Sequence, residues 1–533
     1  MARDAGMTSP AVGLPVPRRV VEPRTSPPRV PAASAGERGP VIASVAVRGE
    51  SGDGAALVRQ VVATLGDAAE IVDRGMADGG QEARLALADG VVLRVVAGPP
   101  TNPKAEPEHT IVISAIVDHV GAASADKLRA LLSAVARVGF TPLELAELRA
   151  QMPLTATLPR FVAPRCLGGV APMLTVHHMT DFLVMVEAAL AMGVSPSTLT
   201  VIDKGYRYRH TGRVDAHLRA LGIAVFPWTA ARAALVDHAG RARALGRRGV
   251  LIDDGGYTLP TLLDQLPDLV PAFAGLVEQT TSGIIKLEPY ADRLPVPVFS
   301  VAESRLKATI ESFGIADASI RNTLRLLPEE KFEGQPALVI GFGRIGEQIA
   351  EVLRDRRMRV AVYDTTLVRL IAAHERGFLT ARSLAQLLAE HQPLLVVGTT
   401  GRPSVRGEHL AFVRRDCYLV STTSRTNEFA LDELTDEAQH VRDVGVTGVR
   451  LHLGSGPAVT VLADGFPINF HHAESLPNKF ADLVLAALLV GAATLARPDH
   501  GFAPGHNVAA TDAVLESCGL LDRYYQRFGP TAR

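Results

Sequence analysis

The chain has 533 residues, which is too long for a single domain with one hydrophobic core and favours two or three domains. Because 47% of the residues are hydrophobic, the chain can fill the cores of these domains. Its formal net charge of -1 gives no general attraction to nucleic acid or to an anionic membrane. No apolar run reaches the length of a membrane span, and 481–496 is expected to be a buried helix. Cys166, Cys417 and Cys518 lie far apart without zinc-site spacing, which favours reduced thiols in a cytoplasmic protein and predicts no metal.

The first part of the chain divides into two segments. Residues 1–40 are rich in Pro, Arg, Ser and Ala and lack hydrophobic periodicity, so we expect a disordered tail, without the apolar stretch of a signal peptide. Residues 41–155 mix short β-like runs with helical ones, which predicts an accessory α+β module. Its role is either oligomerisation, partner binding or simple packing. The expected strands are 41–47, 91–96 and 110–117, and the expected helices are 55–65 and 124–138.

From residue 156 to about 330, strands and helices alternate, which is typical of a parallel sheet covered on both faces. We expect a substrate-binding α/β domain here, completed by residues 480–533. Polar residues at the carboxyl ends of such strands face the ligand. The strand-end residues are His178, Asp254 and the segment Glu278–Gly283. His177, beside His178, is predicted to be a packed or surface histidine.

Residues 331–479 begin with an apolar strand, 336–340, that leads through spaced glycines into a helix. Gly341 permits a tight turn, Gly343 allows the backbone to approach a pyrophosphate, and Gly346 permits close packing of helix on strand. Arg344 and Ile345 lie within the same loop. The next strand ends in Asp364, which can accept hydrogen bonds from both ribose hydroxyls and repel a 2′-phosphate. This segment therefore predicts a dinucleotide-binding domain that uses NAD rather than NADP.

A cluster of cations and aromatic residues follows a strand end at residues 203–213. Arg207 and Arg209 could bind a phosphate or carboxylate of the substrate through two hydrogen bonds each. A solvated loop or a subunit contact explains the same cluster equally well. Trp228 is expected to be a core residue, although it could stack on a base.

The order of these landmarks resembles S-adenosyl-L-homocysteine hydrolase. The resemblance covers roughly residues 165–500 and depends on seven motifs in the same order. Three motifs come before residue 290: H-M-T is matched by His178–Thr180, D-D-G-G by Asp253–Gly256, and E-E-T-T-T-G by Glu278–Gly283. The family's lysine segment is matched by Glu303–Lys307 and its glycine loop by Gly341–Gly346. Its T-T-G is matched by Thr399–Gly401 and its late Asn by Asn469.

The resemblance implies an enzyme that holds NAD tightly and uses it to oxidise a ribose hydroxyl transiently, so that a neighbouring carbon becomes acidic. It assigns Lys307 as the acceptor of the hydroxyl proton, Glu311 as its partner, and Asp254 with His178 as an acid–base pair. The implied cofactor-binding residues beyond the glycine loop are Thr280, Thr281, Ser282, Thr399, Thr400, Gly401 and Asn469. The implied substrate-binding residues are Thr180 and Gln279.

The chain also departs from the family pattern. Gln279 replaces a glutamate, Ser312 an asparagine, and Ile315 a cysteine. A histidine is missing from Thr422–Arg425, and a second histidine-bearing loop is shortened at Ser475–Pro477, where His471 and His472 are possible substitutes. The family's C-terminal lysine and tyrosine have no match in residues 500–533. Because the hydride-transfer set survives better than the groups around the leaving substituent, we expect a redirected substrate or outcome.

The fold class that follows is α/β, with two doubly wound, Rossmann-like parallel-sheet domains and a small N-terminal α+β module. The expected activity is NAD-dependent, on a nucleoside-like or sugar-like small molecule, in a cytoplasmic homo-oligomer without nucleic-acid or membrane partners. Two alternatives stay open. One is a dehydrogenase of the 2-hydroxyacid type, for which Arg425 and the His471–His472 pair are candidates, and the other is an inactive NAD-binding or nucleoside-binding partner protein.

Overall fold

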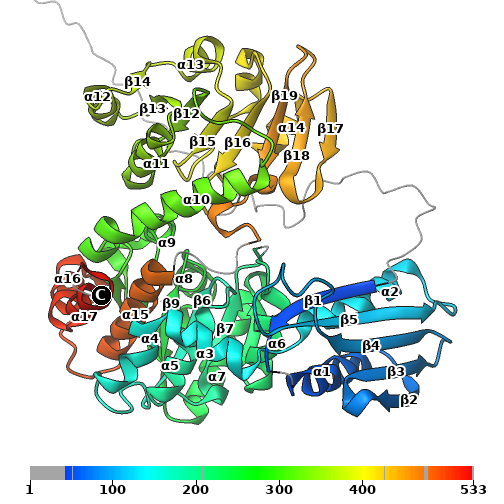
Figure 1. Cartoon of the computed structure of the whole chain (residues 1–533). Helices are drawn as coiled ribbons and strands as arrows, with labels where there is room; N and C mark the ends of the chain where they lie inside the picture. Colours follow the sequence, from blue (N-terminus) through cyan, green and yellow to red (C-terminus); the bar gives the residue numbers. More distant parts are fainter. Residues whose placement is uncertain (1–41, 51, 207, 425, 473–477, 531–533) are drawn as a thin grey trace, which may run out of the picture.

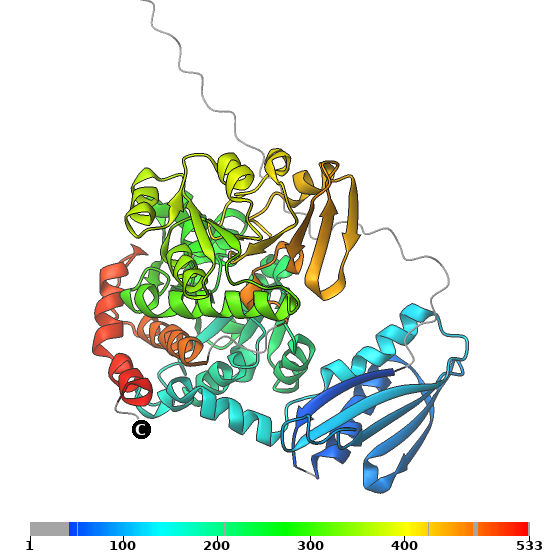
Figure 2. The ribbon, with the colours of Figure 1, turned by 45° about the horizontal axis from the view of Figure 1, so that its top comes forward.

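The computed structural model describes residues 42–530 except 51, 207, 425 and 473–477. The expected disordered tail, Arg207, Arg425 and the shortened loop at Ser475–Pro477 therefore lie wholly or largely outside the described residues. Three sheets organise the rest of the chain. Figure 1 shows the third sheet above the second, with the first sheet to one side, and Figure 2 shows the first sheet projecting from the other two.

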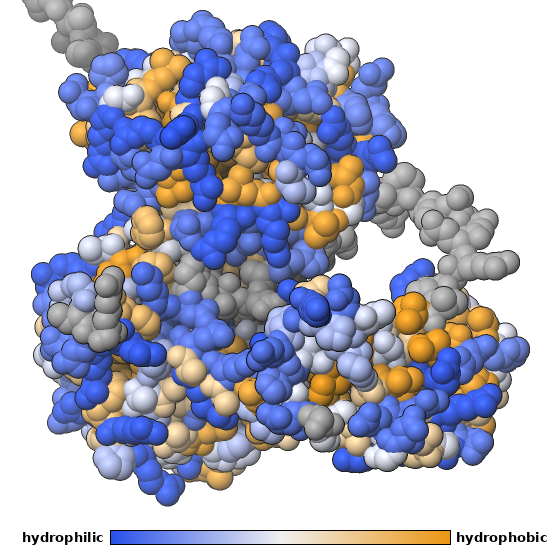
Figure 3. Space-filling model, in the orientation of Figure 1, coloured by the Kyte–Doolittle hydropathy of each residue, from blue (hydrophilic) through white to orange (hydrophobic). Residues whose placement is uncertain are grey.

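The first sheet, sheet A, has five strands in the order β1-β5-β4-β3-β2, and every neighbouring pair is antiparallel. Its strands are β1 (Ile42–Arg48), β2 (Ile71–Ala77), β3 (Glu82–Leu87), β4 (Val92–Gly98) and β5 (Thr110–His119). Alternate residues of β3, β4 and β5 are buried beneath α1 (Asp53–Ala68) and α2 (Ala125–Leu132). The opposite face carries apolar residues at the surface, among them Ile42, and Figure 3 shows such residues over this part of the molecule. Sequence patterning missed β2 and β3. Nearly all residues of β2 are exposed, so no alternation results there, whereas β3 does alternate and was overlooked.

The second sheet, sheet B, has seven strands in the order β20-β11-β10-β9-β6-β7-β8, and all its pairs are parallel. Its strands are β6 (Val170–Val176), β7 (Thr200–Asp203), β8 (Ala224–Pro227), β9 (Arg248–Asp253), β10 (Phe273–Glu278), β11 (Pro297–Ser300) and β20 (Gly505–His506). The strands β6, β10 and β11 are buried along their whole length, as expected for strands covered on both faces. Between residues 142 and 287 the chain forms the helices α3 (Pro142–Gln151), α4 (Pro153–Thr157), α5 (Phe182–Ala191), α6 (Thr211–Ala220), α7 (Ala231–Ala244), α8 (Leu259–Gln265) and α9 (Thr281–Leu287).

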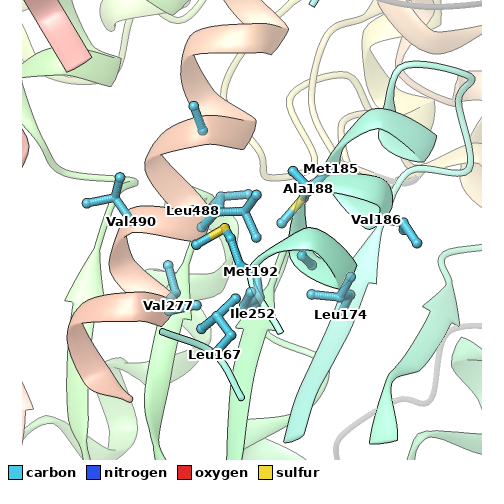
Figure 4. Packing of buried hydrophobic residues seen from close by; sticks show 14 of the residues in the cluster. Leu167, Leu174, Met185, Val186, Ala188, Met192, Ile252, Val277, Leu488 and Val490 are labelled. Atoms are coloured by element: carbon cyan, nitrogen blue, oxygen red, sulfur yellow. The ribbon is translucent and has the colours of Figure 1, made fainter. Parts of the chain in front are cut away.

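The core of sheet B contains a helix from near the end of the chain. Among the described residues, only α15 (Asn478–Leu495) is long and apolar enough to cross a membrane, and 72% of its most apolar window is buried in the protein. Figure 4 shows Leu488 and Val490 of this helix beside Met192, Ile252 and Val277. The helix therefore serves as a core element, and α16 (Val508–Ser517) and α17 (Leu520–Phe528) follow it.

The third sheet, sheet C, has eight strands in the order β14-β13-β12-β15-β16-β19-β18-β17. Its strands are β12 (Pro336–Ile340), β13 (Arg359–Tyr363), β14 (Leu379–Thr380), β15 (Leu395–Gly398), β16 (Cys417–Ser421), β17 (His440–Asp443), β18 (Gly448–His452) and β19 (Ala458–Leu462). Only the pairs that involve β18 are antiparallel. Its helices are α10 (Ser312–Leu326), α11 (Arg344–Asp355), α12 (Leu367–Glu375), α13 (Leu384–His391) and α14 (Leu431–Asp436).

The predicted fold class is confirmed, because two parallel sheets covered by helices follow an N-terminal antiparallel module. Residues 307–311 form a π-helical turn that leads directly into α10. The chain thus passes from sheet B to sheet C through a single helix, shown between the two sheets in Figure 1. It returns through a short helical turn at Ile468–Phe470 and then α15.

Candidate functional site

The glycine turn after β12 has the geometry that each glycine was expected to provide. Gly341 has a φ of 96°, which non-glycine residues rarely adopt. A Cβ added at Gly346 would lie 1.9 Å from the carbonyl oxygen of Gly341, so only glycine allows α11 to approach the turn this closely. A Cβ at Gly343 would meet nothing nearer than an Arg369 nitrogen at 3.8 Å. The backbone at Gly343 is therefore open to a ligand at the N-terminus of α11, where unpaired N–H groups favour phosphate.

Asp364 follows β13 and is largely buried beside this turn. Its carboxylate accepts hydrogen bonds from the backbone N–H of Phe342, at 2.7 Å, and of Thr366, at 2.7 Å. These bonds fix the carboxylate against the glycine turn. Each oxygen retains a lone pair for a ribose hydroxyl.

The segment Thr399–Gly401 follows β15 beside the glycine turn. Thr399 donates through its hydroxyl to the carbonyl oxygen of Gly341 at 3.0 Å. The buried side chain of Glu428 accepts from the backbone N–H groups of Thr400, at 2.9 Å, and Gly401, at 2.8 Å. Burial raises the pKa of Glu428, and the hydrogen bonds to its carboxylate oppose that effect. Sequence analysis missed Glu428, whose only signal was an acid shortly after β16.

Asn469 lies in the helical turn by which the chain leaves sheet C. Its side chain is 3% exposed, and its Oδ1 atom has no hydrogen-bond partner among the described residues. A buried amide oxygen of this kind is costly unless a ligand donates to it. Together with the open backbone at Gly343 and the fixed Asp364, this atom fits a dinucleotide that carries a carboxamide at one end. The residues of the turn and Asn469 would hold NAD.

Lys307 and Glu311 occupy the π-helical turn between the two sheets. Their Nζ and Oε2 atoms are 3.1 Å apart, and the lysine also donates to the backbone carbonyl of Gln279. Burial raises the pKa of Glu311, and the nearby Lys307 partly offsets this rise. Single-turn π-helical segments often occur at functional sites. The structure therefore brings together the lysine, the acid and the Gln279 backbone that the sequence nominated.

Asp254 follows β9 and is 2% exposed. Its Oδ1 atom accepts from the Nζ of Lys204 at 2.7 Å, and its Oδ2 atom is 3.0 Å from the Nε2 of His177. Burial alone would raise the pKa of Asp254, but the Lys204 charge and the His177 contact outweigh it and hold that pKa well below its usual range. Burial and Lys204 lower the pKa of His177 to about 4, so this imidazole is neutral at pH 7.

The histidine beside Asp254 is thus His177, whereas the sequence had assigned that place to His178. His178 is fully buried, its ring is nearly parallel to that of Phe182, and neither ring nitrogen has a hydrogen-bond partner among the described residues. Its Nδ1 atom lies 4.0 Å from Asp203. Adjacent residues after a strand point to opposite sides, so an offset of one residue decides which imidazole reaches the site. His177, predicted to be a packed or surface histidine, packs on Phe470 and also contacts Asp254 and Lys204.

Glu278 and Asp253 form a second buried acidic pair, at the ends of β10 and β9. Glu278 accepts from the N–H and hydroxyl of Thr280, both at 2.9 Å, and Asp253 accepts from the N–H groups of Tyr257 and Thr258. Burial and the charge of Asp253 raise the pKa of Glu278 to about 8. One oxygen of each carboxylate has no partner among the described residues. These acids fix the loops that follow β9 and β10.

The other nominated residues lie in varied surroundings. Thr280 caps α9 by accepting from the Gly283 N–H at 3.1 Å, while Thr281 is exposed and Ser282 half-buried in the first turn of that helix. Thr180 is buried after β6. In the glycine turn, Arg344 is exposed and Ile345 half-buried.

The cationic cluster at 203–213 divides in the structure. Arg213 is buried and binds Glu144 in two places, so it joins α6 to α3. Arg209 is exposed and lines a groove of about 450 Å³ bordered by β1 and residues 129–136. Lys204, which the sequence had counted only as part of the cluster, is buried against Asp254. Sequence analysis thus missed Lys204 and Tyr208, because nothing in their spacing distinguishes them from neighbouring surface cations and aromatic residues.

Residues 312–475 match the family model described as S-adenosyl-L-homocysteine hydrolase, NAD binding domain. An uncharacterised protein of Mycobacterium tuberculosis strain H37Rv is 30% identical over 350 residues, which span 62% of this chain and 64% of that protein. The S-inosyl-L-homocysteine hydrolase of Methanopyrus kandleri is 24% identical over 67% of this chain and 84% of its own length. The adenosylhomocysteinase of Gloeothece citriformis is 26% identical over 44% of this chain and 55% of its own length.

Among solved structures, the A chain of dipicolinate synthase from Bacillus subtilis is 12% identical, with a TM-score of 0.36 over 61% of this chain and 97% of that chain. The predicted cofactor, NAD, and the predicted resemblance are confirmed by the family match and the relatives. Residues 312–475 are therefore similar to the NAD-binding domain of S-adenosyl-L-homocysteine hydrolase, and a longer part of the chain is distantly similar to adenosylhomocysteinases and their relatives.

Proposed function

We propose that this protein is an NAD-dependent enzyme that transiently oxidises a hydroxyl group of a nucleoside-like or sugar-like substrate. The observation that carries the proposal is the Lys307–Glu311 pair in the π-helical turn between sheets B and C, with a separation of 3.1 Å. A largely buried lysine beside a buried acid, held between a dinucleotide-binding domain and a second sheet, suits removal of a hydroxyl proton. Two relatives are named as hydrolases of nucleoside–homocysteine compounds, which supports a nucleoside-like substrate.

In this proposal each group of the chain has one task. Lys307 takes the hydroxyl proton, while the Gln279 carbonyl and Glu311 fix the position of its nitrogen. Glu311 also orients the neighbouring hydroxyl. Bound NAD supplies an acceptor that takes the hydride and returns it within one turnover. The chain needs no second nucleotide for such a cycle.

The group around Asp254 and His177 provides a second place for proton transfer. Oxidation of a hydroxyl to a ketone acidifies the C–H bond of the adjacent carbon, so an acid–base group near that carbon permits elimination, epimerisation or hydrolysis. Gln279 stands where the related enzymes have a glutamate, and a lysine, Lys204, is bound to Asp254. We therefore propose a substrate or outcome that differs from hydrolysis of adenosylhomocysteine. The domain boundaries, the homo-oligomer and the cytoplasmic location stay predictions.

The test begins with protein purified without added nucleotide. We expect bound NAD, and we expect the nicotinamide absorbance of the reduced form to rise when adenosine-type or inosine-type compounds are added and to fall again as turnover ends. Lys307→Met should bind NAD normally but lower the rate of reduction by a factor of about 100 to 10,000. Lys331→Met, at an exposed position, is the matched control.

Three other outcomes would contradict the proposal. Net release of reduced nucleotide with a 2-hydroxyacid would indicate an ordinary dehydrogenase. Binding of NAD without reduction by any nucleoside or sugar would indicate an inactive binding protein. Equal loss of activity in Lys307→Met and Lys331→Met would remove the special role of Lys307.

A further inference from the structure

The two edge strands of sheet A differ in how open they are to pairing. β2 carries Asp73, Arg74 and Gly75 at its centre, and its register against β3 shifts between Ile71 and Asp73. Charged residues, proline and bulges keep a sheet edge from pairing with another strand. β1 has none of these before Arg48, and it pairs with β5 over seven residues without a shift. The outer edge of β1 is therefore open to pairing, and in the described part of the chain no strand pairs with it.

The backbone of β1 alternates in direction. Gly49, which follows the strand, donates its N–H to the carbonyl oxygen of His109 on the β5 side at 2.8 Å. The N–H of Arg48 instead donates to the carboxylate of Glu144 at 3.3 Å, and its carbonyl oxygen accepts from the hydroxyl of Thr141, both outside the sheet. In an antiparallel pair, the N–H and C=O of one residue point to the same side, and the side changes with every residue. The even-numbered residues of β1 therefore direct their backbone groups away from β5.

A groove of about 450 Å³ lies along this outer edge. Residues 42–46 of β1 form one wall, and Leu132, Val135 and Ala136, at the end of α2 and in the helical turn after it, form the other. A strand edge beside an apolar wall suits an extended peptide, because the edge supplies main-chain hydrogen bonds and the wall receives alternate side chains. The shape of the groove therefore favours an extended segment over a compact ligand.

The charged residues that line the groove are basic. Arg129 of α2 and Arg209, which precedes α6, are both exposed, and among the described residues no Asp or Glu lines the groove. Figure 1 shows β1 running from the α2 side of the module toward α6, so these cations belong to segments at opposite ends of the strand. Arg129 contacts Asp126 at 2.5 Å in an exposed pair, which a ligand can replace at little cost. Arg213 also lines the groove, but Glu144 binds its guanidinium. The remaining charge favours an acidic ligand.

We propose that this groove binds an acidic, extended segment of a partner protein, which joins sheet A as a further strand beside β1. The backbone of the segment exchanges hydrogen bonds with Ile42, Ser44 and Ala46, and its alternate side chains face the apolar wall. Its carboxylates lie near Arg129 and Arg209. Because a strand rises about 3.3 Å per residue, a segment of about seven residues matches the length of β1. The N-terminal module thereby serves as a docking module, and this role does not depend on the proposed reaction.

Segments of this chain itself match the groove less well. Residues 1–40 contain six arginines against three acidic residues, and they contain eight prolines, which lack the N–H that a strand ladder needs. A second copy of β1 would bring the segment Ile42–Arg48, which has no acidic residue. Charge therefore favours a separate partner over either of these occupants.

The first test measures peptide binding to the full-length protein by fluorescence anisotropy. The probe is a labelled peptide of about seven alternating glutamate and valine residues. We expect saturable binding with a Kd below about 1 mM, and at least about tenfold weaker binding of the same peptide with lysine in place of glutamate. Methylation of every second amide of the acidic peptide, in one of the two possible registers, should also weaken binding at least about tenfold, because it removes the donors that face β1. Equal binding of these peptides, or no binding of the acidic one, would overturn the proposal.

The second test changes the groove. Ser44→Pro removes an outward N–H but no bond to β5, so it should weaken binding of the acidic peptide at least about tenfold. Ser44→Ala, the matched control, keeps the N–H and should bind as wild type does. Arg129→Gln combined with Arg209→Gln should weaken binding by about three- to tenfold, and Arg84→Gln, at an exposed position of sheet A outside the groove, should not. Wild-type affinity in both groove variants would overturn the proposal. Thermal melting shows whether Ser44→Pro folds, and if it does not, the methylated peptides decide.

Two further outcomes would identify a different occupant and overturn the proposal. A synthetic peptide of residues 1–40 that displaces the probe more effectively than unlabelled acidic peptide would show that the chain's own N-terminal segment is the ligand. A dimer in sedimentation experiments that Ser44→Pro converts to monomers would show that β1 pairs with a second copy. Failure of the proposed reaction would leave these measurements unaffected, since none of them uses turnover.

Discussion

The carboxyl ends of sheets C and B present different parts of the chain. At sheet C, the exposed features are backbone groups: a glycine turn with a φ of 96° at Gly341, and the open N-terminus of α11. At sheet B, the features are ionisable side chains, buried in contact with one another around Asp254 and in the adjoining Lys307 turn. The carboxyl end of sheet C is suited to bind a dinucleotide, a ligand that many proteins use. The other is suited to a particular proton transfer.

Because one site is built from backbone and the other from side chains, the carboxyl ends of sheets C and B should respond differently to amino-acid substitution. Backbone geometry needs glycine at fixed positions, because any side chain would clash or strain the turn. A network of buried charges depends on every member, since removal of one partner leaves another charge unpaired. We therefore expect substitutions at sheet C to separate binding from stability and substitutions at sheet B to separate individual chemical steps.

The largest expected effect on NAD binding is at the glycines of sheet C. Gly346→Ala would place a Cβ 1.9 Å from the Gly341 carbonyl oxygen, so α11 must shift, and we expect a loss of about 1–3 kcal/mol in unfolding free energy. Gly343→Ala meets no close protein atom, so stability without nucleotide should stay within about 0.5 kcal/mol of wild type. Both variants should weaken NAD binding by about tenfold or more, which corresponds to about 1.4 kcal/mol.

Thermal melting without NAD and calorimetric titration with NAD measure the two quantities. If Gly343→Ala bound NAD as tightly as wild type, the nucleotide would not approach the backbone at that residue. If Gly346→Ala were as stable as Gly343→Ala, the close approach of α11 would not matter for folding.

The adjacent histidines test sheet B. His177→Asn should lower turnover by a factor of about 100 to 10,000, because the group bound to Asp254 loses its imidazole. His178→Leu should lower turnover by less than about tenfold, since it replaces a buried ring whose nitrogens have no partners in the part of the chain that the structure describes. Steady-state rates for both variants, normalised to bound NAD, give the comparison. A greater loss in His178→Leu would restore the assignment made from the sequence alone.

The smallest expected effect on turnover concerns Glu278, which orders a loop rather than taking part in proton transfer. Its pKa is raised from its ordinary value to about 8, so the folded protein holds a proton that the unfolded chain releases between those values. Stability should therefore fall as pH rises from about 5 to 8, by at most about 1.4 kcal/mol for each pH unit. Glu278→Gln should flatten this dependence in urea unfolding curves, and Glu333→Gln, at an exposed site, should not. A parallel slope in Glu278→Gln would mean that this acid is ionised in the folded state.

The same contrast explains what the sequence could predict. Strand, glycine turn and terminal acid occupy consecutive segments, so Gly341, Gly346 and Asp364 could be located from spacing alone. The alternation of strands and helices predicted both parallel sheets for the same reason. Lys307 and Glu311 were assigned by the family resemblance, and the structure places them four residues apart on one helical segment.

Other groups depend on contacts between distant segments. Lys204, Asp254 and His177 come from the ends of β7, β9 and β6, and their meeting is a property of strand order rather than of local pattern. The choice between His177 and His178 depends on the orientation of the backbone after β6, which neighbouring identical residues cannot reveal. β2 escaped prediction because its exposure removes the alternation on which strand prediction relies.

The return of the chain from sheet C to sheet B through α15 and β20 has a consequence for synthesis. Translation proceeds from the N-terminus, so every strand of sheet C leaves the ribosome before the helix that fills the core of sheet B. During synthesis, one apolar face of sheet B therefore stays uncovered until α15 has been made, whereas the nucleotide-binding part can already fold. Chains interrupted between residues 470 and 495 would consequently expose that face and are the truncations that we expect to aggregate or to recruit chaperones.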